Sequence, residues 1–216
     1  MRVLVLGGSG RTGKVIINEA LSRGHTVTAL VRNPTSLSEL QFPPLDLIRG
    51  SPQNKSDIRT AFAEHTPDAV IVALASNEEG FMASVHRILV EVIEETGLEG
   101  KTKVVTMQAF GVGSSNKNVW IPMRVVLNYS PMAKGQADHN MVEEVMRGSG
   151  LKWTLPRPVM LSEGEKKDVR DCGDAGDVKG MGVMPTISRK SVAAFLLDVA
   201  EDESGKWVGR TPVILD

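Results

Sequence analysis

Short apolar runs alternate with segments of helical periodicity along most of the chain. The first run, residues 2–6, predicts a buried strand, and residues 14–23 predict a helix. Gly24 is placed to end that helix, because glycine readily adopts the left-handed conformation favoured at a helix C-terminus. Residues 25–31 predict a second strand. The N-terminal region therefore predicts a strand–helix–strand unit with a glycine-rich first turn.

The alternation continues to the C-terminus. Further apolar runs predict strands at 45–48, 68–75, 103–107, 153–156 and 208–215. The continuous apolar character of 68–75 is typical of a parallel strand buried on both faces.

The predicted helices lie between these strands. Ser56-Asp57 are placed to cap a short helix, residues 81–93 form an amphipathic helix that Gly97 ends, and Asp138 to Arg147 form another. Ser188 is placed to cap the last helix. Two segments stand apart. Apolar residues in 119–135 suggest a helix interrupted by Pro122 and Pro131, whereas the charged, glycine-rich 162–180 predicts a surface loop or flap.

These alternating elements predict an α/β fold, a Rossmann-type doubly wound and mainly parallel sheet that forms a single domain over residues 1–216. Ligands of such sheets bind at the carboxyl ends of the strands, where the strand order reverses. We therefore expect one crevice to collect the residues that follow successive strands.

The first turn, Gly7-Gly-Ser-Gly-Arg-Thr-Gly13, indicates a nucleotide-binding site. Missing side chains at Gly7 and Gly10 would let a pyrophosphate approach the backbone, and Gly13 would let the helix pack closely on the strand. The helix N-terminus would offer free N–H groups and a positive dipole to the phosphates. The alternative is a purely structural turn.

The end of the second strand favours NADP(H) over NAD(H). An acidic residue there would bind the adenosine ribose, but the chain carries Arg32. A guanidinium can bind a 2′-phosphate in a bidentate manner, and Arg11 could add a second positive contact. The alternative for Arg32 is a solvated loop residue.

Further candidate ligands follow from their positions after the predicted strands. We expect the cofactor to contact residues of the first turn and of the strand ends: Gly7, Ser9, Gly10, Arg11, Thr12, Gly13, Arg32, Ser51, Leu74, Ala75, Ser76, Gln108, Phe110, Pro158 and Val159. Met160, Met181 and Met184 could form a soft apolar wall for a flat substrate, although core packing is the commoner role of methionines. Phe110 is a further substrate-site candidate that could flank the nicotinamide, with core packing as the alternative.

Composition excludes several other classes. The net charge of −1 and pI near 6.4 give no sign of a nucleic-acid or anionic-membrane surface, and no apolar run approaches the length of a spanning helix. The histidines and the single Cys172 show no metal-ligand spacing. With the first strand starting at residue 2, we expect no signal peptide, a cytoplasmic location, and a monomer or homodimer acting on a small molecule.

With these positions identified, the chain resembles the atypical short-chain dehydrogenase/reductases. It is most similar to NmrA-like NAD(P)-binding proteins and to the flavin reductase/biliverdin-IXβ reductase branch. The resemblance rests on the glycine turn, Val31-Arg32, residues 104–113, Asp138-His139, residues 149–154 and Arg157-Pro158. It implies NADPH binding, and it says little about the substrate because the fold hosts many chemistries.

The family's usual catalytic residues are missing from the expected places. Gln108 stands where typical members carry a serine, and His139 and Gly135 stand at the lysine and tyrosine positions. The single Tyr129 is five residues from Lys134, so the two do not share a helix face. The resemblance therefore makes His139 a candidate proton donor or ribose ligand, with a helix-surface role as the alternative. Gln108 would donate a hydrogen bond to the substrate or to the carboxamide.

Three functions remain open at this stage. The favoured one is hydride transfer from NADPH to a flavin, quinone, tetrapyrrole or carbonyl/enone metabolite, which mainly requires the substrate to stack on the nicotinamide. The others are a non-catalytic NADP-binding sensor and an isomerase or epimerase that uses bound cofactor.

Overall fold

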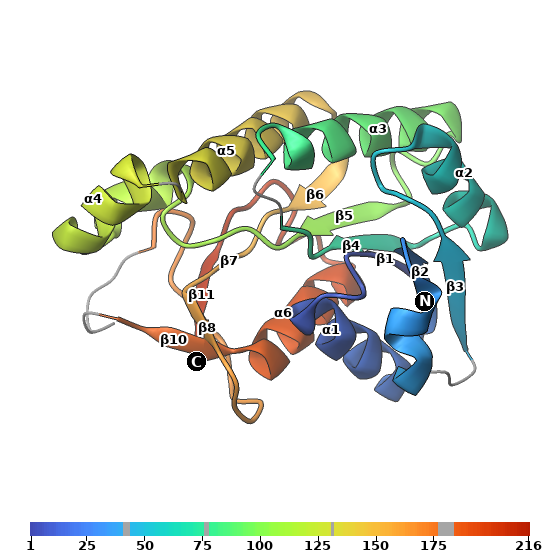
Figure 1. Ribbon diagram of the computed structural model, residues 1–216, viewed down its shortest axis with the longest axis horizontal. Helices are drawn as coiled ribbons and strands as arrows, with labels where there is room; N and C mark the ends of the chain where they lie inside the picture. The colour runs from blue at the N-terminus through green and yellow to red at the C-terminus, as the bar shows by residue number, and fades with distance from the viewer. Residues whose placement is uncertain (41–43, 76–77, 131, 177–183) are drawn as a thin grey trace.

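The computed structural model describes residues 1–216 except 41–43, 76–77, 131 and 177–183. Its centre is a parallel six-stranded sheet of order β3-β2-β1-β4-β5-β6 (Figure 1). The strands are β1 (Arg2–Leu6), β2 (Thr26–Val31), β3 (Leu45–Arg49), β4 (Ala69–Val72), β5 (Lys103–Thr106) and β6 (Lys152–Thr154). The chain builds outward from β1 in one direction and then from β4 in the other. The strand order therefore reverses between β1 and β4, as expected for a doubly wound fold.

Helices cover both faces of the sheet. On one face lie α1 (Arg11–Ser22) and α6 (Arg189–Glu201), and on the other lie α2 (Lys55–Glu64), α3 (Phe81–Glu95) and α5 (Met132–Gly148). The helix α4 (Ile121–Tyr129) lies beyond α5 at one end of the molecule, and two 3₁₀ helices, η1 (Pro34–Leu40) and η2 (Gly113–Asn118), complete the set (Figure 1).

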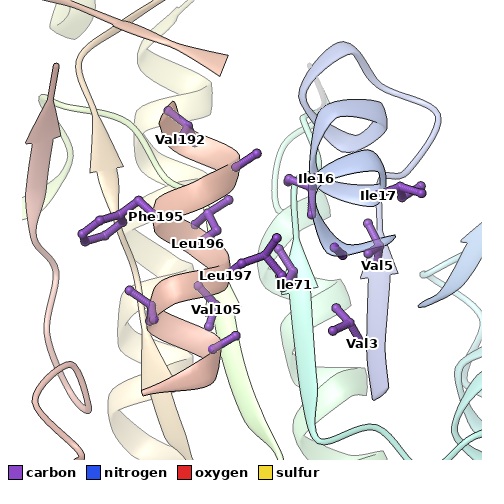
Figure 2. Packing of buried hydrophobic residues seen from close by; sticks show 14 of the residues in the cluster. Val3, Val5, Ile16, Ile17, Ile71, Val105, Val192, Phe195, Leu196 and Leu197 are labelled. Carbon is purple, nitrogen blue, oxygen red and sulfur yellow. The ribbon is translucent and has the colours of Figure 1, made fainter. Parts of the chain in front are cut away.

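Two cores result from the alternation of side chains along the strands. In β1, Val3 and Val5 point to the α1/α6 face, whereas Leu4 and Leu6 point to the α2/α3/α5 face. Figure 2 shows the first core, in which Val3 and Val5 lie opposite α1 and Val105 lies against α6. Because both faces are buried, the central strands carry the continuous apolar runs that predicted them.

Short strands extend the structure beyond β6. A three-stranded sheet has the order β7-β11-β9, formed by Arg157–Pro158, Val213–Leu215 and Arg170–Asp171, and β8 (Met160–Ser162) pairs in parallel with β10 (Thr186–Ser188). The predicted strand over 208–215 is therefore confined to its last three residues. The predicted flap contains β9 and joins this layer at β11.

Three predicted helix features were wrong. The cap of α2 is Asn54, whose Oδ1 accepts the Ser56 N–H at 2.9 Å, while Asp57 accepts the Ser51 N–H at 2.8 Å. Pro122 does not interrupt a helix but lies in the first turn of α4, where proline has no backbone hydrogen bond to lose, and Pro131 lies outside the described residues. The helix expected from Asp138 already starts at Met132. By contrast, the predicted Ser188 cap is confirmed by its bond from the Ser191 N–H.

Candidate functional site

The glycine turn requires glycine for reasons of close packing. At Gly7, φ is +92°, and a Cβ would lie 2.4 Å from the carbonyl oxygen of Ala73 at the end of β4. A Cβ on Gly13 would lie 2.1 Å from the carbonyl oxygen of Gly7. The tight approach of α1 to β1, predicted for Gly13, is therefore present. Gly7 additionally lets the turn pass beside β4.

The N-terminus of α1 faces outward from this turn. Ser9, Gly10 and Arg11 are exposed, Thr12 is buried, and Gly10 caps the helix without a side-chain hydrogen bond. The first turn of α1, all of it described, carries no acidic residue. Free N–H groups and a positive helix end without a competing carboxylate fit the pyrophosphate of a dinucleotide.

One arginine lies at the carboxyl end of β2 and another at the carboxyl end of β3. Arg32 follows β2 and is exposed, and Arg49 is the register partner of Val31. Neither guanidinium has an ion pair or hydrogen bond with any described residue. Arg11, in contrast, lies 3.9 Å from Glu163, a contact between exposed groups. Sequence reasoning identified Arg32 but missed Arg49, which only the pairing of β3 with β2 brings to this edge.

An apolar pocket of about 290 Å³ lies beyond the end of β5. The predicted Phe110, Pro158, Val159, Met160 and Met184 line it together. Its remaining lining residues come mainly from the two residues after η2, from α4 and from the start of α5: Ala109, Val119, Trp120, Met123, Leu127, Met132, Gln136 and Pro185. Sequence reasoning missed this second group, and the apolar periodicity of 119–135 was its only signal. Ser76 and Met181 lie outside the described residues.

Apart from the Trp120 indole, Gln136 carries the one polar side chain among the described lining residues, and its Oε1 is buried without a hydrogen-bond partner among the described residues. Leaving a buried amide oxygen unpaired costs roughly 1–3 kcal/mol. A substrate hydroxyl or N–H group that donates to this oxygen would recover that cost.

Gln108 and His139 lie together but do not line the described pocket. Gln108 is buried, and its Nε2 donates to the carbonyl oxygen of His139 at 2.8 Å. Its Oε1 accepts from Arg157 Nε at 3.3 Å. The Nδ1 of His139 is buried without a partner among the described residues, and burial lowers the pKa of this imidazole. The neutral form therefore dominates at neutral pH.

The neighbours of His139 serve the fold. Asp138 is buried and its carboxylate accepts the N–H groups of Met82 and Ala83 at 2.8 and 3.0 Å, which caps α3. His86 is buried between the carbonyl of Met82 and the hydroxyl of Thr106. These contacts join α5 to α3, and α3 to β5.

The remaining predicted ligands lie at the same edge of the sheet. Leu74 and Ala75 follow β4, and Ser51 follows β3. Phe110 follows β5, its N–H donating to the carbonyl of Pro158 at 2.9 Å. Parallel strands thus bring these positions to one edge of the sheet, as the predicted fold implied.

No group of three or more metal-ligating side chains occurs among the described residues, and no helix in the described part of the chain is long and apolar enough to cross a bilayer.

Comparison with known proteins identifies the family. Residues 7–203 match the family described as NAD(P)H-binding, and the chain belongs to it. The resemblance to NmrA-like, atypical short-chain dehydrogenase/reductases is thereby confirmed. The protein therefore belongs to an oxidoreductase-like, NAD(P)H-binding class with a Rossmann-like domain.

Individual relatives are distant. The uncharacterized protein YwnB of Bacillus subtilis is 25% identical over 168 residues, which cover 73% of this chain and 71% of that protein. The anaerobillin reductase ChuY of Escherichia coli is 16% identical, with a TM-score of 0.79 over 100% of this chain and 97% of that one. A short-chain dehydrogenase/reductase of Veillonella parvula in complex with NADP is 18% identical, with a TM-score of 0.71 over 100% and 94%. These structural similarities show the fold.

Proposed function

We propose that this protein is an NADPH-dependent reductase of a small, flat, uncharged substrate. The observation that carries the proposal is the pocket beside Phe110 and Pro158, at the same edge of the sheet as the glycine turn. A cofactor whose pyrophosphate lies on the N-terminus of α1 would extend toward that pocket along the ends of β1, β4 and β5. Phe110, Pro158 and Val159 would then contact both nicotinamide and substrate.

Two cations support NADPH as the preferred cofactor. Arg32 and Arg49 present guanidinium groups without partners among the described residues, where the adenosine ribose of a bound dinucleotide is expected. A 2′-phosphate would receive charge-assisted hydrogen bonds from them, whereas a ribose hydroxyl needs no cation. The NADP bound to the Veillonella parvula protein is consistent with this assignment.

The pocket narrows the substrate class. None of its described lining residues carries an ionisable side chain, so carboxylates and phosphates would lose their hydration without gaining a counter-charge. Its volume of about 290 Å³ lies at the lower end of ligand sites, which span about 300–1,000 Å³. A neutral quinone or enone therefore fits better than a tetrapyrrole or a phosphorylated flavin.

The chain's own residues would bind and orient this substrate. Gln136 Nε2 would donate to a substrate oxygen, and the pocket's methionines would pack on the ring. Gln108 would hold the backbone of His139 in place. When bound, NADPH would supply a hydride and become NADP⁺, and water would supply the proton that completes reduction of the substrate. His139, being neutral, is better suited to hydrogen-bond a cofactor hydroxyl than to donate a proton.

The test is a titration with NADPH and with NADH, followed by nicotinamide fluorescence, and then a panel of neutral quinones, enones, flavins and biliverdin. We expect tighter binding of NADPH and its oxidation by neutral quinones or enones. Binding of both NADPH and NADP⁺ without turnover of any panel member would favour the non-catalytic sensor. Absence of nucleotide binding would refute the proposal altogether.

A further inference from the structure

The outer face of α4 is apolar and exposed. Ile121, Val125 and Tyr129, spaced four residues apart, share one face of the helix and are 65%, 52% and 85% exposed. Val126 is exposed beside them. A surface helix normally places polar residues outward, but here the opposite face is apolar too. The inward Met123 and Leu127 line the pocket, so α4 separates the pocket from solvent with apolar side chains on both sides.

This face continues into the mouth of the pocket. Trp120, Met132, Met160 and Met184 are each at least half exposed and also line the pocket. Together with Ile121, Val125, Val126 and Tyr129 they form what we call the α4 surface. Figure 1 shows α4 at one end of the long axis of the molecule, where nothing else of the chain lies beyond it. Contiguous exposed apolar surfaces of this kind mark sites of association with other molecules or with membranes.

The charged residues in the sequence on either side of α4, from 100 to 137, are all cationic. Between Glu99 and Asp138 the sequence contains no acidic residue, whereas Lys117, Arg124 and Lys134 flank the helix on both sides and within it. Lys117 and Lys134 are exposed and their amino groups have no partner among the described residues. The acidic Asp174 of the neighbouring loop already pairs with Arg210 at 3.3 Å. The α4 surface is thus apolar with a cationic border.

We infer that the α4 surface docks on an anionic lipid bilayer. An apolar helix face bordered by lysines, with tryptophan and tyrosine at its ends, lies stably in the interfacial plane of a membrane. The border of cations would meet anionic headgroups while Ile121, Val125 and Tyr129 enter the boundary with the acyl chains. The pocket mouth would then open toward the bilayer. Under the proposed function, on which this last step rests, the substrate would be an apolar molecule dissolved in the membrane.

Charge also distinguishes the bilayer from a second copy of this chain. In a two-fold symmetric dimer the same patch meets itself, which would bring the cations of both borders together without acidic partners. An anionic bilayer complements them instead. From the net charge of −1 we expected no membrane surface. The net charge is a sum over the whole chain, so it does not reveal a local border of cations.

The experiment is flotation of the purified full chain with vesicles of phosphatidylcholine alone or of equal parts phosphatidylcholine and phosphatidylglycerol. We expect binding to the anionic vesicles that weakens with salt. Val125→Asp should lower the partition coefficient by more than roughly ten-fold, since a charge is placed in the apolar boundary. Val208→Asp, at a residue that is 43% exposed against 52% for Val125, is the matched control and should bind as the wild type does.

The contribution of the cationic border is tested with separate variants. Lys117→Gln and Lys134→Gln should each lower partition into anionic vesicles roughly five-fold, the change that corresponds to about 1 kcal/mol per lysine. Lys101→Gln, at an exposed lysine outside this border, should change little. Unaltered thermal unfolding midpoints would show that the variants fold.

Three outcomes would overturn the inference: no vesicle binding, binding that Val125→Asp leaves intact, or a concentration-dependent dimer in sedimentation that Val125→Asp dissociates. Vesicle binding requires no nucleotide, so the docking inference can hold even if the reductase proposal fails. Nucleotide binding and quinone reduction in detergent-free solution can likewise succeed while docking fails.

Discussion

The completely buried side chain of Arg157 forms an ion pair with the carboxylate of Glu143. The pair ties β7 to α5, and Gly113 passes over it so closely that a Cβ there would lie 2.6 Å from Arg157 Nη2. Arg157 also donates to Ser114 Oγ at 3.1 Å and to the carbonyl of Asp174 at 3.2 Å. One buried cation thus organises the backbone behind the pocket.

Removing one partner of this pair should be costly. Glu143→Leu leaves the buried guanidinium without its counter-charge, and we expect a loss of about 3–5 kcal/mol in the free energy of unfolding. Urea denaturation measures it, with Glu144→Leu, at the exposed neighbour, as the control. The double variant Glu143→Leu/Arg157→Met should recover most of the loss. A double variant as unstable as the single one would show that the charge is not the cause.

Gln136 should affect the substrate and not the cofactor. Gln136→Leu keeps the side-chain volume similar but removes the only hydrogen-bonding group among the pocket's described side chains apart from the Trp120 indole N–H. We expect the KM for a quinone to rise by the equivalent of about 1–2 kcal/mol while the NADPH Kd stays unchanged. Steady-state kinetics with Gln53→Leu, at an exposed glutamine, provides the comparison. An unchanged KM would assign Gln136 to packing.

Arg32 should discriminate between the two nicotinamide cofactors. Arg32→Ala should weaken NADPH binding by roughly 1–3 kcal/mol and NADH binding by much less, because only NADPH carries the 2′-phosphate. Arg87→Ala, at an exposed arginine of α3, should change neither dissociation constant. Equal losses for the two cofactors would contradict the 2′-phosphate role. The same titration on Arg49→Ala tests the second cation.

His86 should make the fold sensitive to acid. Complete burial lowers the pKa of its imidazole from 6.5 to about 4, opposed by the hydrogen bond with the Met82 carbonyl. Between these values the unfolded chain binds a proton that the folded chain does not, so the free energy of unfolding falls as the pH falls. The loss is about 3 kcal/mol at most. Urea titrations from neutral pH to pH 4 should show it, and His86→Gln should reduce the slope while His65→Gln should not.

His139 should contribute to turnover without titrating near neutral pH. Its pKa is lowered by burial and by the charge of Arg157, although Asp138 opposes the shift, so the imidazole stays neutral there. We expect His139→Ala to lower kcat and to weaken NADPH and NADH binding alike by roughly 0.5–1.5 kcal/mol, because it removes a hydrogen bond to a hydroxyl that both cofactors carry. We expect the wild-type rate to show no ionisation at the ordinary histidine pKa. A bell-shaped pH–rate profile centred on the ordinary histidine pKa would instead assign His139 the role of proton donor.

Local sequence was sufficient for the central architecture. The runs that form β1, β2, β4 and β5 are apolar because the inner strands of a sheet covered on both faces bury nearly all their side chains, whereas the edge strand β3 is only partly buried. The glycine turn was equally clear, because a strand that enters a helix within a few residues restricts the backbone at Gly7 and Gly13. Both signals depend on neighbours in sequence. Both were therefore visible without the fold.

The sequence alone predicted only part of the candidate site. Phe110, Pro158 and Met160 were expected beside the cofactor because strand ends meet at one edge of a parallel sheet. Trp120, Met123 and Gln136 were not, because they come from a segment whose prolines obscured its helices and whose packing depends on contacts with η2 and the strands beyond β6. The cap of α2 was missed for a smaller reason, since Asn54, Ser56 and Asp57 are all acceptable capping residues.

What the sequence determined by itself was the class of fold and the dinucleotide turn, because hydrophobic periodicity, the alternation of strands and helices, and the spacing of glycines can be read without tertiary context. What only the tertiary structure decided was the environment of single side chains. It placed Gln108 in internal hydrogen bonds, made His139 neutral through burial, paired Arg157 with Glu143, and left Ile121, Val125 and Tyr129 facing outward. Burial and electrostatic partners come from residues distant in sequence, and only folding brings them together.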